Sequence, residues 1–172
     1  MKNFTVIRRT VILLMILAVI SGGVVLYTDS HHPIMPNLTL TLLNGDLLSL
    51  ETLRKNPLLI YFWATTCAVC IEEMPVLTKL YHEFSPQGFN IIGIAMYYDP
   101  PNRIVSFTRN HHLPYFIAFD LERTAAQAFG DVKLIPVHFL IDQQGKIVYT
   151  RKGKLNEPSL RQHIIRLLKD KK

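Results

Sequence analysis

Cysteine is scarce in this chain: 172 residues contain two, Cys67 and Cys70. A zinc site built from thiolates uses up to four cysteines, and no third or fourth cysteine is present. Internal repeats and low-complexity stretches are also lacking, and the basic residues form no stripe with interleaved aromatic side chains. The first lack argues against a structural metal site. The others argue against a repeat protein and against a protein that binds nucleic acid.

Charged residues are missing from a long apolar run, residues 10–27. About 18 residues in a helix just cross the ~30 Å hydrocarbon core of a bilayer, so we predict a transmembrane anchor here. Lys2, Arg8 and Arg9 precede the run and supply half of the formal net charge of +6. Because lysine and arginine residues that flank a transmembrane helix remain on its cytoplasmic side, residues 1–9 are expected in the cytoplasm and the rest of the chain outside it.

The alternative to an anchor is a secretory signal peptide, with the small residues 21–23 at its cleavage site. The apolar run continues past these residues, and no clean Ala-x-Ala site is present, so a retained segment is favoured. Either interpretation exports the remaining chain to an oxidising compartment, where a cysteine pair is chemically meaningful.

Residues 28–36 are predicted to be a linker, because prolines interrupt them, and residues 37–172 a single α/β domain. Alternating apolar residues indicate a β-hairpin around Asn44 and Gly45, and a continuous apolar run indicates a strand buried on both faces at 58–63. The later elements expected are helices at 68–84, 99–110, 123–129 and 158–168, strands at 89–95 and 114–119, and a hairpin of 137–141 with 146–150. This order predicts a mixed sheet with helices on both faces.

The cysteine pair follows the buried strand directly, at the predicted start of the helix 68–84. Unpaired N–H groups and the helix dipole at that end favour a thiolate at Cys67, and a thiolate is the form that attacks a disulfide. Cys70 lies one helical turn further on and returns beside Cys67, so it is expected to resolve a mixed disulfide. A purely structural disulfide is the alternative, but so short a loop constrains the unfolded chain little.

Residues 61–70, YFWATTCAVC, and residues 73–75, EMP, closely resemble the TlpA-like thiol–disulfide oxidoreductases of the thioredoxin superfamily. The resemblance implies a thioredoxin-like α/β fold, with a central mixed β-sheet flanked by helices, an N-terminal β-hairpin and one preceding transmembrane helix. It implies a protein-disulfide reductase whose redox-active centre is the Cys67–Cys70 disulfide, with no other cofactor and no metal. It also implies a single-pass protein of the bacterial inner membrane, with the catalytic domain in the periplasm.

A second segment, LIPVHFLID at residues 134–142, resembles the motif in which a cis-proline of this family faces the cysteines. The resemblance implies that Pro136 is that cis-proline, and that Ile135 before it offers backbone hydrogen bonds to the substrate chain. Trp63 and Thr66, beside the cysteine pair, complete the implied substrate-binding residues. Many relatives carry tryptophan where this chain has Thr66, so the site is expected to be more open.

Glu73 lies three residues after Cys70 on the same helix face, where the family often keeps a glutamate. A partly buried carboxylate here tunes the pKa of the thiols and relays protons. A glutamate on the solvated surface does neither. The sequence leaves both interpretations open. Tyr61 replaces the buried aspartate of thioredoxins themselves, so that proton relay is absent. His138, after the cis-proline, either lies near the redox pair or points into packing or solvent.

Ala68 and Val69 carry no charge that stabilises a thiolate strongly, so the sequence favours a reductant over a strong oxidant. The resemblance implies two partners: an upstream membrane electron donor, and an exported protein substrate with cysteines, such as an apocytochrome in cytochrome c biogenesis or a copper-delivery factor. A monomer that binds no nucleic acid is expected. The alternatives are an oxidase or isomerase of the same fold, and a copper-binding thiol module that uses Cys67, Cys70 and His138.

Overall fold

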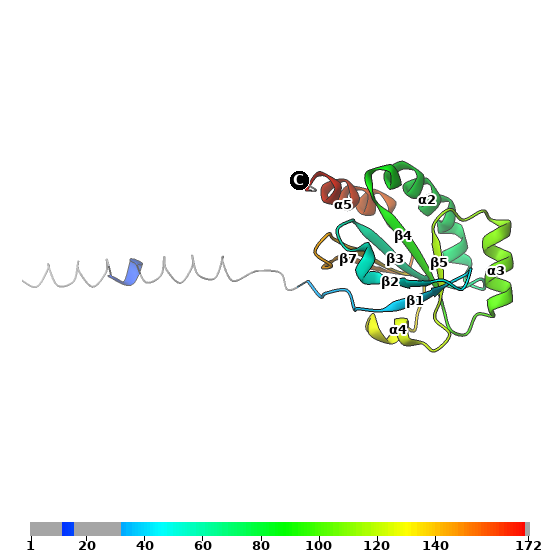
Figure 1. Cartoon of the computed structure of the whole chain (residues 1–172). Coiled ribbons are helices and arrows are strands. Elements are labelled where there is room, and N and C mark those ends of the chain that lie inside the picture. Colours follow the sequence, from blue (N-terminus) through cyan, green and yellow to red (C-terminus); the bar gives the residue numbers. More distant parts are fainter. Residues whose placement is uncertain (1–11, 16–31, 171–172) are drawn as a thin grey trace, which may run out of the picture. The chain divides into compact units, whose positions relative to one another are not determined.

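The structure is a computed structural model, which describes residues 12–15 and 32–170 (Figure 1). Residues 32–170 belong to one compact unit of the chain, and residues 12–15 belong to another. Ile12 to Met15 are helical, and the rest of the predicted anchor, residues 10–27, lies outside the described residues. Within the described ranges, no helix combines the length and the apolarity that crossing a bilayer needs.

In the described part of the chain, seven strands form one mixed sheet in the order β2-β1-β5-β4-β3-β6-β7. The three central strands β3, β4 and β5 are parallel to one another, and the other pairings are antiparallel. The strands are β1 (Thr39–Leu42), β2 (Leu47–Ser49), β3 (Leu58–Trp63), β4 (Asn90–Ala95), β5 (Phe116–Phe119), β6 (Val137–Ile141) and β7 (Ile147–Lys152). The helices are α2 (Ala68–Phe84), α3 (Pro101–Asn110), α4 (Thr124–Ala128) and α5 (Glu157–Lys169), with short 3-10 helices η1 (Leu50–Leu53) and η2 (Ser85–Gln87).

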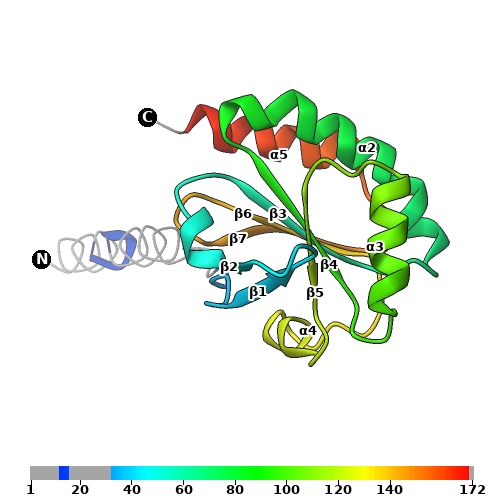
Figure 2. The same ribbon diagram turned by 45° about the vertical axis from the view of Figure 1, so that its right-hand side comes forward.

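The sheet separates two hydrophobic clusters. One lies under α2, α3 and α5, which contribute Leu77, Ile104 and Leu160 to it. The other lies under η1 and α4, which contribute Leu50 and Ala126. Figures 1 and 2 show α5 beside α2 on one side of the sheet and α4 on the other. All six residues of β3 are buried because helices cover both faces, as its continuous apolar run predicts.

The predicted order of elements is confirmed, with differences of a few residues at their ends. Asn44 and Gly45 lie in the turn of the N-terminal hairpin, and Gly45 has a φ of 87°, which glycine adopts without a steric penalty. The strand predicted at 114–119 begins later, at Phe116, where pairing with β4 starts. The α/β architecture with a mixed sheet and helices on both faces is therefore as predicted.

The predicted linker is shorter than expected, because its last residues belong to the domain. The carbonyl of Pro33 accepts the N–H of Ile147, and the N–H of Met35 donates to the carbonyl of Gly145, both at 2.8 Å. Met35 is 2 % exposed and packs in the cluster on the α4 side. A proline breaks helices but keeps its carbonyl as an acceptor, so the segment joins the hairpin of β6 and β7 despite its prolines.

Candidate active site

The cysteine pair lies just beyond the end of β3. Cys67 is the N-cap of α2, and its Sγ accepts the N–H of Cys70 at 3.2 Å. A disulfide joins the two residues, with the Sγ atoms 2.08 Å apart. Cys70 is 1 % exposed, whereas Cys67 is half-buried. Cys67 is therefore the sulfur that a partner can reach, which is the arrangement that the predicted roles require.

Asp99 fixes the segment between β3 and the cysteines. It is 3 % exposed, and its carboxylate accepts the backbone N–H of Thr65 at 2.5 Å and the hydroxyl of Thr65 at 2.7 Å. The sequence motifs did not single out Asp99. The signal was present, because Asp99 follows β4 and Thr65 follows β3, and the carboxyl ends of adjacent parallel strands meet at one edge of the sheet.

We expect Asp99→Ala to lower the free energy of unfolding by about 1–3 kcal/mol, because Thr65 keeps a part-buried N–H without its acceptor. Chemical denaturation of the oxidised protein measures this loss. Glu122→Ala is the matched control, since Glu122 is exposed and a surface substitution changes stability by about 0.5 kcal/mol or less. Equal denaturation midpoints for the two variants contradict the anchoring role of Asp99.

The peptide bond between Ile135 and Pro136 is cis, as predicted. Pro136 is buried, and its carbonyl accepts the N–H of Gly153 at 2.8 Å, which ties this loop to the end of β7. Ile135 is half-buried and packs against the cluster that contains Cys70. The structure therefore brings the loop before β6 and the cysteine pair together at one end of the sheet.

The two remaining predicted substrate-binding residues differ in exposure. Thr66 is exposed, next to the reachable Cys67. Trp63 is 0 % exposed, and its ring packs 5.5 Å from the ring of Phe107, centroid to centroid. A substrate cannot touch an indole that α3 covers, so the prediction is corrected: Trp63 supports the site from beneath. The reason is that β3 is sandwiched between helices along its whole length.

Glu73 is buried, so the surface interpretation of this residue is wrong. It is 4 % exposed, and its Oε2 lies 2.9 Å from Nε2 of His138 in a hydrogen bond. Its Oε1 accepts the backbone N–H of Leu155 at 2.5 Å. His138 is 0 % exposed, because alternation along β6 places its side chain on the face that α2 and α5 cover. The carboxylate thus bonds to β6 and to the loop before α5.

Tyr61 occupies the space beside this pair. Its ring stacks on that of His138 at 6.1 Å, and its hydroxyl lies 3.2 Å from that of Tyr115. Gly93 on β4 makes room, because a Cβ there lies 2.9 Å from the Tyr61 hydroxyl. Burial raises the pKa of Tyr61 well above its ordinary value and that of Tyr115 to about 12. Both phenols therefore stay protonated near neutral pH. The carboxyl group at this place belongs to Glu73 on α2, and the strand β3 contributes a tyrosine instead of an acidic residue.

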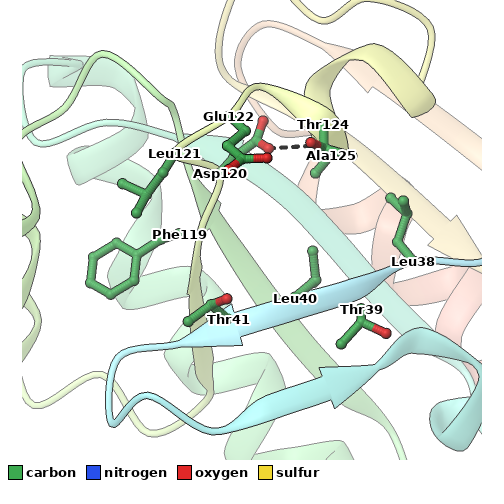
Figure 3. Close-up of a pocket in the computed structure, with 10 residues that line it drawn as sticks. All are labelled: Leu38, Thr39, Leu40, Thr41, Phe119, Asp120, Leu121, Glu122, Thr124 and Ala125. Carbon is green, nitrogen blue, oxygen red and sulfur yellow. Dashed lines mark hydrogen bonds between the residues drawn. The ribbon is translucent and has the colours of Figure 1, made fainter.

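A pocket of about 270 Å³ between β1 and the segment after β5 is not a rival redox site (Figure 3). Its lining contains neither cysteine nor histidine. The buried carboxylate of Asp120 in it accepts the N–H groups of Ala125 and Ala126 at 2.8 and 2.9 Å. Burial raises the pKa of Asp120, and the two N–H groups partly oppose this.

Throughout residues 12–15 and 32–170, no three His, Cys, Asp or Glu side chains cluster as metal ligands do.

Comparisons with known proteins find similarity to proteins of thiol–disulfide chemistry. A family model described as Redoxin matches residues 30–164. Thiol-disulfide oxidoreductase ResA of Geobacillus thermodenitrificans (strain NG80-2) is 28% identical over 171 residues, which are 95% of this chain and 96% of the relative. ResA of Halalkalibacterium halodurans is 31% identical over 121 residues, 70% of this chain and 68% of the relative. A solved thiol:disulfide interchange protein of the thioredoxin family from Chlorobium tepidum TLS has a TM-score of 0.73 at 20% identity, covering 82% of this chain and 99% of its own, so the two share a fold.

Proposed function

Since the chain belongs to the Redoxin family and is a thiol–disulfide oxidoreductase with a Cys67–Cys70 pair, we propose that it reduces disulfides of exported proteins. The observation that carries the proposal is the placement of this disulfide at the N-terminal end of α2, with Cys67 reachable and Cys70 buried. The helix end stabilises a thiolate at Cys67, and burial protects Cys70 from outside reagents.

The proposed reaction begins with the reduced protein. The Cys67 thiolate attacks one sulfur of a substrate disulfide, forms a mixed disulfide and releases one substrate thiolate, which takes up a proton. Cys70 then loses its proton and attacks the Sγ of Cys67, which releases the second substrate thiol and closes the Cys67–Cys70 disulfide. Two electrons pass to the substrate. An upstream dithiol donor at the membrane then supplies two more, which reduce the Cys67–Cys70 disulfide again while the donor is oxidised to its own disulfide.

Glu73 is proposed to accept the proton of Cys70 in the second step. It lies one helical turn after Cys70 on α2, and His138 and Leu155 hold its carboxylate in place. A groove of about 570 Å³ borders Glu73, with Lys154 and Pro158 on its walls, and it opens a route for the proton to solvent. His138 acts through Glu73 as a positioning residue.

The cis-proline loop is proposed to orient the substrate. Ile135 precedes the cis bond and packs against the cysteine cluster, so its backbone is available to an extended chain that brings a disulfide to Cys67. Thr66, exposed beside Cys67, is proposed to contact the same chain.

The location is proposed from the N-terminal sequence. Residues 10–27 are proposed to anchor the protein in the bacterial inner membrane, with residues 1–9 in the cytoplasm and the catalytic domain in the periplasm. There a monomer takes electrons from a membrane donor and passes them to exported substrates, apocytochromes in cytochrome c biogenesis among them. Fractionation of cells tests this: the chain is expected with the inner membrane, and recovery of a shortened, freely soluble form supports a cleaved signal peptide instead.

The direction of electron flow is tested by the reduction potential of the Cys67–Cys70 couple. Equilibration with glutathione buffers, followed by thiol alkylation, is expected to give a value between about −180 and −270 mV, the range of exchange proteins and reductants. A value of about −120 mV, which is typical of strong oxidants, contradicts the reductase proposal and favours an oxidase of the same fold.

A further inference from the structure

A second groove opens on the opposite face of the sheet from Glu73 and His138. Its volume is about 390 Å³, and it lies between β6, β7 and the segment that follows α4. Its floor is apolar: Phe129 and Phe139 are each 7 % exposed, and their rings lie 5.1 Å apart. Paired residues of the two strands, Val137 with Lys152 and Phe139 with Thr150, form one side. The floor is thus a packed apolar surface.

This groove begins at the cis-proline loop. Leu134, which immediately precedes Ile135, is on its wall and is 83 % exposed. Val137, which follows Pro136, is also part of its lining. A chain held at Ile135 with its disulfide at Cys67 therefore has neighbouring residues that reach the groove, because extended residues advance by about 3.3 Å each.

The walls carry more positive than negative charge. Lys133 and Lys152 line the groove, together with Asp131. Asp131 is already engaged, since Lys133 at 2.9 Å and Arg123 both form ion pairs with it. These pairs lower the pKa of Asp131 below its ordinary value. An acidic residue on a ligand is therefore attracted to the Lys152 side of the groove.

We infer that this groove binds the residues beside the target cysteine of a polypeptide substrate, an apolar side chain on the phenylalanine floor and an acidic side chain next to Lys152. The inference rests on the proposed function and adds a sequence preference to it. The groove and the buried pair of Glu73 and His138 lie on opposite faces of the sheet. Substitution of Leu134 or Lys152 in the groove therefore removes no hydrogen bond of Glu73 or of His138.

The test uses the reduced protein and two synthetic peptides, each with one cysteine in a mixed disulfide with thionitrobenzoate. One peptide carries the dipeptide Leu-Glu two residues from the cysteine. The other peptide carries Ser-Lys at the same two positions and is otherwise identical. Free dithionitrobenzoate is the basal disulfide. The reduced protein is expected to prefer the Leu-Glu peptide in kcat/KM, and Lys152→Glu is expected to reduce this preference by about three- to tenfold, with a smaller effect at high salt.

Leu134→Ser tests the apolar contribution of the groove to peptide binding. The variant is expected to fold normally, because the side chain of Leu134 is exposed. We expect a lower kcat/KM for the Leu-Glu peptide and an unchanged rate with free dithionitrobenzoate. Lys79→Glu on α2 is the matched control for Lys152→Glu, since Lys79 is also an exposed lysine and does not line the groove. Equal preference in wild type and both groove variants overturns the inference. No reaction with any of the three disulfides overturns the proposed function instead.

Discussion

A Cys70→Ser variant is expected to hold its substrate as a mixed disulfide through Cys67. Cys67 keeps its reachable position and its helix N-terminus, so the first attack proceeds. Without the Cys70 thiol, the second attack cannot occur, and the complex survives until an outside thiol releases it. Non-reducing electrophoresis of the variant with periplasmic extract, followed by mass spectrometry of the adduct, identifies both the substrate and the cysteine that it uses.

The matched variants distinguish the roles of the two cysteines. Cys67→Ser is expected to form no adduct, because the remaining thiol of Cys70 is buried. Turnover of either variant is expected to fall on the order of 10³-fold or more, as for other nucleophiles that act as a unit. An adduct on Cys70 in the Cys67→Ser variant reverses the assignment of nucleophile and resolving thiol.

Loss of the buried partner of His138 is expected to have the largest effect on stability. Glu73→Ala leaves the imidazole and the N–H of Leu155 buried without their acceptor, so the free energy of unfolding should fall by about 2–6 kcal/mol, which is about 1–3 kcal/mol for each unsatisfied group. This is a large part of the ~5–15 kcal/mol that holds a domain together. Glu72→Ala is the control, because Glu72 is the next residue on α2, is exposed, and pairs with Lys154 only at 3.6 Å.

Glu73→Gln separates the chemical role of Glu73 from its structural role. The amide fills the same volume and keeps an acceptor, but it cannot take a proton, so resolution of a preformed mixed disulfide on Cys67 should slow on the order of 10²-fold at neutral pH. The deficit should shrink as the pH rises towards about 8.5, where a free thiol ionises unaided. Stopped-flow release of thionitrobenzoate measures the rate. A Glu73→Gln rate equal to that of wild type at every pH removes Glu73 from the mechanism.

Local patterns predicted most of the fold. The continuous apolar run of residues 58–63 predicted a strand buried on both faces, and the Asn44-Gly45 turn predicted a hairpin, because each depends on residues close in sequence. The position of Cys67 at a helix start follows from the same short segment. The cis bond before Pro136 came from the resemblance of a motif, since an isolated Ile-Pro peptide is usually trans.

Contacts between distant segments were not predicted. His138 meets Glu73 across 65 positions of sequence, and only the register of β6 on β3 determines which face its side chain takes. Asp99 reaches Thr65 because β3 and β4 are adjacent and parallel, which composition does not reveal. The burial of Trp63 has the same cause, since it depends on the packing of α3 over the sheet.

The backbone bonds of Pro33 and Met35 to the turn between β6 and β7 fix the point at which the chain enters the domain. Leu58, the first residue of β3, pairs with Ile141 at that turn, whereas Cys67 lies past the other end of β3. A strand of six residues is about 20 Å long, so this entry point and the cysteine pair lie at opposite ends of β3. Residues 33–35 therefore leave uncovered the end of the sheet beyond which Cys67 lies.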